Sequence, residues 1–157
     1  MITYRIISTS LSMPGARFCS MSIESKDEAE KIRKFLSKDY HSYLESNILK
    51  QLFGSALPSI TGFNRSHSFI QSCTDNEEEG SHYMVISSSI SMPGARFCSQ
   101  LVDNMDEAEK IKNMLASNNL SEQESNILRG HFGSAIPSIT GFNKGYSYIQ
   151  ATIDTDK

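Results

Sequence analysis

The chain has 157 residues, of which 21% are charged and 38% hydrophobic, and it carries a net charge of −3 with a pI near 5.8. This composition is typical of a globular protein, and the acidic balance disfavours a nucleic-acid binder, which usually presents a basic stripe. Neither a run of about 18 apolar residues nor a basic-then-apolar leader is present. We therefore expect no membrane association and a cytoplasmic location.

Three cysteines, Cys19, Cys73 and Cys98, occur without a CxxC spacing. An odd number of cysteines without that spacing indicates neither a disulfide framework nor a zinc site. We expect reduced thiols that pack as small hydrophobic side chains, with no metal and no cofactor.

A repeat divides the chain. The segment SMPGARFCS begins at Ser12 and again at Ser91, an offset of 91 − 12 = 79 that continues without a gap. Pairing residues 3–75 with residues 82–154 gives 41 identities in 73 pairs. We predict a tandem duplication, with the first repeat unit at 1–75, an acidic linker at 76–81 and the second unit at 82–157.

Each unit is expected to open with a hairpin. A strand over 4–11 is followed by Pro-Gly at 14–15, which suits a type II turn because proline presets φ and glycine accepts a positive φ. The return strand is expected over 17–23, where alternation places Cys19 and Ile23 on one face.

Two capped helices are expected next. Ser25 with Glu28, and Ser42 with Glu45, have the spacing of a capping box, and each precedes apolar residues at helical intervals. Gly54 stands where a left-handed residue would end the second helix. The second unit repeats all of these signals.

A closing strand is expected at about 66–74 and at 147–153. Each unit is then β-β-α-α-β, and the fold class is α+β. We predict two tandem ββααβ units that form a pseudo-two-fold intramolecular dimer, with a mostly antiparallel sheet and helices packed on one face. An open sheet edge or face in each unit would pair with the other unit.

The segment 54–64, repeated at 133–143, combines glycines, a proline, hydroxyls and an amide. Such a loop can offer N–H groups and hydroxyls to a phosphate or carboxylate, while an arginine supplies charge. The candidate ligand- or partner-binding residues are Arg17, Ser55, Ser59, Thr61 and Asn64, with their counterparts Arg96, Ser134, Ser138, Thr140 and Asn143. No known phosphate motif is matched, and a well-packed crossover from helix to strand is the alternative interpretation.

The two units also differ in a patterned way. Residues 33–43 differ from their counterparts at most positions, whereas MPGARFCS and the 54–64 segment are nearly the same in both units. A shared packing demand or a shared binding surface would each produce this contrast.

Catalytic residues are not duplicated. None of the four histidines has a histidine at its counterpart position, and the repeated acidic residues fall in predicted first helical turns, where they favour the helix dipole. Without a repeated acid, base, nucleophile or metal set, we predict that the chain is not an enzyme.

Three functions remain open. The first is a non-catalytic cytosolic binding or inhibitory protein that presents two equivalent surfaces to a macromolecular partner, such as a phage or mobile-element regulator of a host enzyme. The second is a small-ligand protein with two pockets for a phosphate-bearing molecule or nucleotide. The third, which the acidic charge disfavours, is a module associated with nucleic acid or restriction–modification.

Overall fold

The computed structural model describes residues 1–10, 12–60, 67–139 and 146–154. The first half contains β1 (Ile2–Thr9), β2 (Arg17–Cys19), α1 (Lys26–Leu36), α2 (Tyr43–Phe53), a 3-10 helix (Gly54–Ser59) and β3 (Ser68–Thr74). A short 3-10 helix (Glu77–Glu79) leads into the second half, which contains β4 (His82–Ser88), β5 (Arg96–Cys98), α3 (Met105–Ala116), α4 (Glu122–Phe132), a 3-10 helix (Gly133–Ser138) and β6 (Ser147–Thr152). The chain is α+β, as predicted.

The six strands form one closed antiparallel barrel in the order β1-β2-β5-β4-β6-β3. Two seams join the halves: β2 pairs with β5 at Phe18↔Phe97, and β3 pairs with β6 at Cys73↔Thr152 and beyond. Closure leaves no free sheet edge, and it was not predicted.

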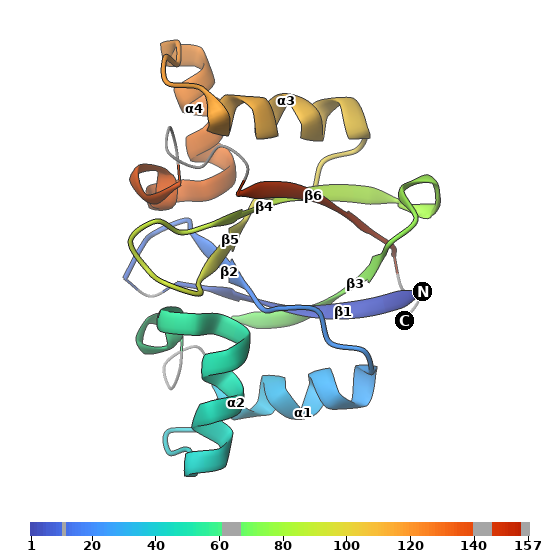
Figure 1. Cartoon of the computed structure of the whole chain (residues 1–157), viewed down its shortest axis with the longest axis vertical. Coiled ribbons are helices and arrows are strands. Elements are labelled where there is room, and N and C mark those ends of the chain that lie inside the picture. Colours follow the sequence, from blue (N-terminus) through green and yellow to red (C-terminus); the bar gives the residue numbers. More distant parts are fainter. Residues whose placement is uncertain (11, 61–66, 140–145, 155–157) are drawn as a thin grey trace.

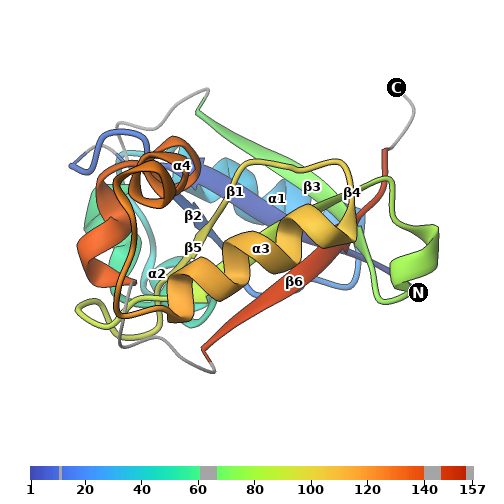
Figure 2. The same ribbon diagram turned by 90° about the horizontal axis from the view of Figure 1, so that it is seen from above.

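Closure also places the helices outside the barrel in two pairs on opposite sides (Figure 1), rather than together on one face. Seen from above, α3 lies over β4 and β6 (Figure 2).

Apolar side chains pack on both sides of the barrel wall. The outer cluster lies between the strands and the helices and includes the fully buried Phe18, Phe53, Phe97 and Phe132. The rings of Phe18 and Phe97 lie 4.6 Å apart between centroids at the β2–β5 seam, so this cluster is continuous between the halves. The inner cluster consists of Ile7, Cys19, Cys73, Met84, Ile86 and Cys98.

The predicted return strand is correct only at its start. The strand β2 ends at Cys19, and Ile23 lies in the outer cluster, on the opposite side of the wall from Cys19. The cause is an extra residue in the ladder, which steps from Ile6 beside Ser20 to an isolated bridge between Tyr4 and Ile23. The Ser20 hydroxyl accepts the N–H of Ile6 at 2.9 Å, so the bulge keeps that donor bonded while it reverses the alternation.

The predicted starts of the helices are confirmed. Ser25 caps α1 by accepting the N–H of Glu28, and a complete capping box between Ser42 and Glu45 opens α2. The corresponding box opens α4. Gly54 ends α2 with a positive φ of 62°, as expected, but its ψ of −142° lies outside the left-handed helical region.

Candidate functional site

The predicted glycine-rich loops join the two halves of the chain. The backbone N–H and the hydroxyl of Ser55 both donate to the carbonyl of Pro93, at 2.9 and 3.0 Å. In return, the N–H and the hydroxyl of Ser134 donate to the carbonyl of Pro14, at 3.0 and 3.1 Å. Each hairpin turn is therefore held against the helix end of the other half, and we call this pair of contacts the reciprocal latch.

Glycine makes the latch this close. A Cβ added to Gly54 would lie 2.3 Å from the carbonyl carbon of Gly94, and one added to Gly133 would lie 2.4 Å from that of Gly15. Gly15 and Gly94 have φ 81°, which is consistent with the predicted Pro-Gly turns. Because each turn packs on the start of the other half's loop, the near-identity of the turns and of the first loop residues has a packing explanation.

The other predicted loop residues are placed as follows. The hydroxyl of Ser59 lies 3.0 Å from that of Ser12, and the hydroxyl of Ser138 lies 2.9 Å from that of Ser91. Four of the predicted residues, Thr61, Asn64, Thr140 and Asn143, lie outside the described residues. The loop residues remain a prediction as a ligand site.

Arg17 and Arg96 belong to a different region from the described loop residues. They are half-buried in β2 and β5, opposite Thr9 and Ser88. Arg17 lines a small pocket of about 230 Å³ at the barrel, together with Ile7, Phe69, Gln71, Met84, Cys98, Ser99, Gln100 and Leu101. None of the loop residues that the structure describes lines this pocket.

The three thiols lie inside the barrel wall, close to arginines. The hydrogen bond from Cys98 lowers the pKa of Cys19, with Arg5 and Arg96 acting in the same direction against the effect of burial. That hydrogen bond, followed by burial, raises the pKa of Cys98 well above its usual value. Burial raises the pKa of Cys73 to about 12. All three cysteines are buried, as expected of small packing residues.

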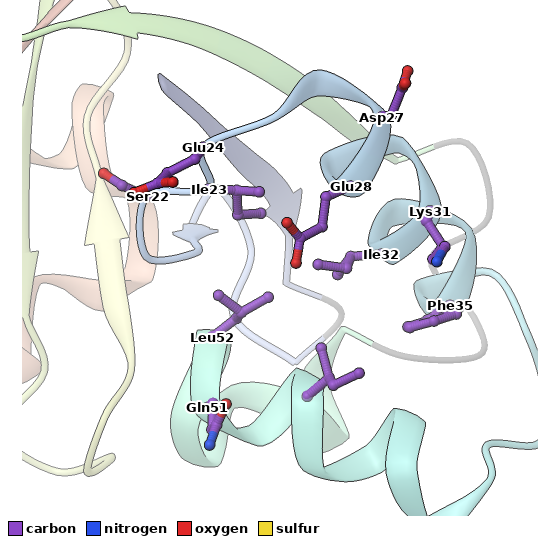
Figure 3. A pocket seen from close by; sticks show the side chains of 11 residues that line it. Ser22, Ile23, Glu24, Asp27, Glu28, Lys31, Ile32, Phe35, Gln51 and Leu52 are labelled. Carbon is purple, nitrogen blue, oxygen red and sulfur yellow. The ribbon is translucent and has the colours of Figure 1, made fainter. Parts of the chain in front are cut away.

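A larger groove lies between α1 and α2, with a volume of about 720 Å³ (Figure 3). Apolar side chains form its floor: Ile23, Ile32, Phe35, Ile48 and Leu52. Charged side chains form its rim: Glu24, Asp27, Glu28 and Lys31. In Figure 3 the carboxylate of Glu28 points into the groove, whereas Asp27 points away from it.

A second groove of about 450 Å³ lies between α3 and α4. Seven of its eight lining residues stand 79 positions after lining residues of the first groove: Asp106, Glu107, Lys110, Ile111, Met114, Ile127 and His131. The two grooves are therefore built from equivalent positions of the repeat. One clear difference is His131, which stands where the first groove has Leu52.

His131 is a partly buried titratable group in an apolar setting. Burial lowers its pKa, although the nearby Glu107 acts in the opposite direction. Its buried Nδ1 has no hydrogen-bond partner among the described residues. Protonation of His131 is therefore disfavoured in the folded chain.

Sequence reasoning identified most groove residues only as helix faces, and it overlooked Arg5 and Met84. Arg5 is the one charged residue of the opening strand Ile2–Thr9, and the repeat places Met84 at its counterpart position. That mismatch between two otherwise similar strands was the available signal.

Among the described residues, no group of three His, Cys, Asp or Glu side chains is arranged to bind a metal ion. Within the same residues, every helix is too short or too polar to cross a membrane. Comparison of the chain with protein-family models, curated proteins and solved structures gave no match.

Proposed function

We propose that the chain is a non-catalytic binding protein, in which two ββααβ units related by a pseudo-two-fold axis present equivalent grooves to a protein partner. The observation that carries this proposal is the pair of grooves between α1 and α2 and between α3 and α4, which share seven equivalent lining positions. The helix pairs stand on opposite sides of the barrel (Figure 1), so one chain offers two separate sites.

The lining of the grooves favours a peptide-like occupant. Each has an apolar floor beneath a charged rim, and Ile127 at the second floor is 39% exposed. Grooves of this kind receive the apolar face of an amphipathic segment, with side chains spaced by one helical turn. Buried apolar anchors surrounded by a polar rim are the usual arrangement of protein interfaces.

Charge defines the chemistry of the partner further. Three acidic residues and one lysine line the first groove, a charge of 1 − 3 = −2, and two acidic residues and one lysine line the second, a charge of 1 − 2 = −1. A segment that carries lysine or arginine beside its apolar face would complement both rims and associate faster at low salt. We therefore propose a basic amphipathic segment as the occupant.

The test is a titration of the chain with basic amphipathic peptides selected on a peptide array. We expect two peptides to bind per chain, and we expect the sequences that bind to share apolar residues at helical spacing together with lysine or arginine. Ile48→Glu should remove one site, Ile127→Glu the other, and the double variant both, because a carboxylate would then lie in each apolar floor.

The matched control is Ile90→Glu, the same substitution at an isoleucine that is 50% exposed and outside both grooves. It should leave the number of bound peptides and their affinity unchanged. Unaltered binding by the double groove variant would contradict the proposal, as would turnover of a nucleotide or ester library by the purified chain.

A further inference from the structure

Arg5 is an arginine inside the barrel wall with only 6% of its surface exposed. Its Nε donates to Oε1 of Gln150 at 3.0 Å, and its Nη1 donates to the carbonyl of Ser20 at 2.8 Å. The guanidinium carbon lies 5.8 Å from the ring centroid of Tyr148. No carboxylate among the described residues pairs with Arg5, and two oxygen acceptors, an aromatic ring and the neighbouring thiols of Cys19 and Cys73 surround it.

The 230 Å³ pocket is the equivalent place in the other half of the barrel. The two oxygen acceptors and the ring beside Arg5 all have counterparts, 79 positions away, that line this pocket: Gln71 for Gln150, Ser99 for Ser20 and Phe69 for Tyr148. Met84, the counterpart of Arg5, lines it as well. The sheet register is the same, since Arg5 pairs with Gln71 and Met84 pairs with Gln150. The pocket therefore repeats the surroundings of a guanidinium, but the side chain at the counterpart position is a methionine.

Two oxygen acceptors of the pocket-lining residues have no hydrogen-bond donor among the residues that the structure describes. Gln71 donates its own amide N–H to the carbonyl of Ser72 at 3.1 Å, and none of the described residues donates to its Oε1 or to the carbonyl of Ser99. In the other half, the corresponding acceptors, Oε1 of Gln150 and the carbonyl of Ser20, both bond Arg5. Methionine has no donor that could replace the guanidinium.

Arg17 provides a second binding group for the ligand of this pocket. Its side chain lines the same pocket and forms no ion pair or hydrogen bond with the side chains or backbone of the described residues. A cationic ligand alone would place two positive charges in one small pocket, which is unfavourable without a counter-charge. A carboxylate on the ligand would pair with the planar fork of Arg17 and offset that repulsion.

We propose that this pocket binds a small guanidino acid, whose guanidinium is held by Gln71 and Ser99 against Phe69 and whose carboxylate pairs with Arg17. A volume of about 230 Å³ is below the roughly 300–1,000 Å³ of pockets for drug-sized ligands, so the ligand has to be small. In the other half of the barrel, the guanidinium of Arg5 occupies the place that corresponds to the guanidinium of the ligand. The pocket is separate from the helix grooves, and the proposal does not depend on them.

The probe is free L-arginine, titrated by calorimetry and by NMR of the side-chain amides of Gln71 and Gln150. We expect one site in the natural chain, with the Gln71 amide responding and the Gln150 amide unchanged. Met84→Arg should fill the pocket from within and abolish binding. Arg5→Met should open the equivalent place and give two sites, and the double exchange should move the single site from Gln71 to Gln150.

Three further measurements define the ligand chemistry. L-Lysine and L-norvaline should bind at least tenfold more weakly than L-arginine, a difference of about 1.4 kcal/mol, because neither carries the planar donor group. Arg17→Met should weaken L-arginine by at least tenfold while changing methylguanidine, which has no carboxylate, by less.

Two outcomes would overturn the proposal. One is the absence of L-arginine binding to the natural chain, and the other is equal binding by the natural chain and Met84→Arg. Met84→Arg and Arg5→Met each introduce the side chain that the other half of the chain already holds at the counterpart position. Thermal melting should confirm folding, and if one single exchange fails to fold, the other still decides the result.

Discussion

The reciprocal latch predicts that one methyl group at Gly54 will destabilise the whole chain. The change is Gly54→Ala, which adds a Cβ that would lie 2.3 Å from the carbonyl carbon of Gly94. The obstacle is backbone rather than the end of a flexible side chain, so rotation about a side-chain bond cannot relieve it. The turn at Gly94 has to move, and with it the carbonyl of Pro93 that accepts both hydrogen bonds from Ser55.

The magnitude follows from two separate costs. Gly54 has φ 62° and ψ −142°, a region that is essentially restricted to glycine, and forcing alanine into it costs about 1–3 kcal/mol. Overpacking against a contact that cannot relax costs about 1–3 kcal/mol more. The free energy of unfolding should therefore fall by about 2–6 kcal/mol, a large share of the roughly 5–15 kcal/mol typical of a folded domain.

Urea unfolding followed by circular dichroism measures this change, and Gly130→Ala is the matched control. Gly130 lies in α4, and a Cβ added there meets nothing within 4 Å. Alanine in a helix interior should instead stabilise the chain by roughly 0.5–1 kcal/mol. If Gly54→Ala lowered the free energy of unfolding by less than about 1 kcal/mol, the close backbone contact could not have the cost assigned to it.

Three further predictions concern the groove histidine, the thiols and the barrel seam. Burial lowers the pKa of His131, so below pH 6.5 the unfolded chain binds more protons than the folded chain. The free energy of unfolding should therefore fall as the pH drops from 6.5 toward the folded-state pKa. Urea unfolding at pH 7.5 and 5.5 measures this fall, which His131→Leu should lessen. Because burial raises the pKa of Cys73 to about 12, its thiol should react with a disulfide reagent at pH 8 only as fast as the chain opens, and labelling that is rapid in the folded chain would contradict this. Phe18→Ala should lower the free energy of unfolding by about 3–5 kcal/mol in a urea titration, because it leaves a cavity beside Phe97, and a loss below about 1 kcal/mol would show that the seam does not bear on stability.

The sequence predicted the features that neighbouring residues determine. The Pro-Gly turn at 14–15 and the cap formed by Ser42 and Glu45 each depend on a few consecutive residues, so they could be recognised without the fold. The bulge at Ser20 could not, because it depends on which group accepts the N–H of Ile6 from the neighbouring strand. One extra residue there reversed the predicted face of Ile23.

The closure of the barrel could not be predicted from the sequence, for a different reason. The two halves are so alike that any edge of one could pair with any edge of the other, and the β2–β5 seam consists of the single pair Phe18↔Phe97. The candidate site was divided for the same reason. The predicted serines Ser55 and Ser134 lie in the latch, whereas Arg17 lies at the barrel pocket, and only the arrangement of the strands separates them.

The reciprocal latch bears on how such a chain could arise. A gene for one half alone would encode a protein whose turn and helix end find their contacts only in a second molecule, as in a homodimer with an isologous interface. Fusion of two such genes would fix the stoichiometry and allow a codon to change in one half while the other keeps the original. Arginine at position 5 and methionine at position 84 can then face the same barrel, which no assembly of two identical subunits permits.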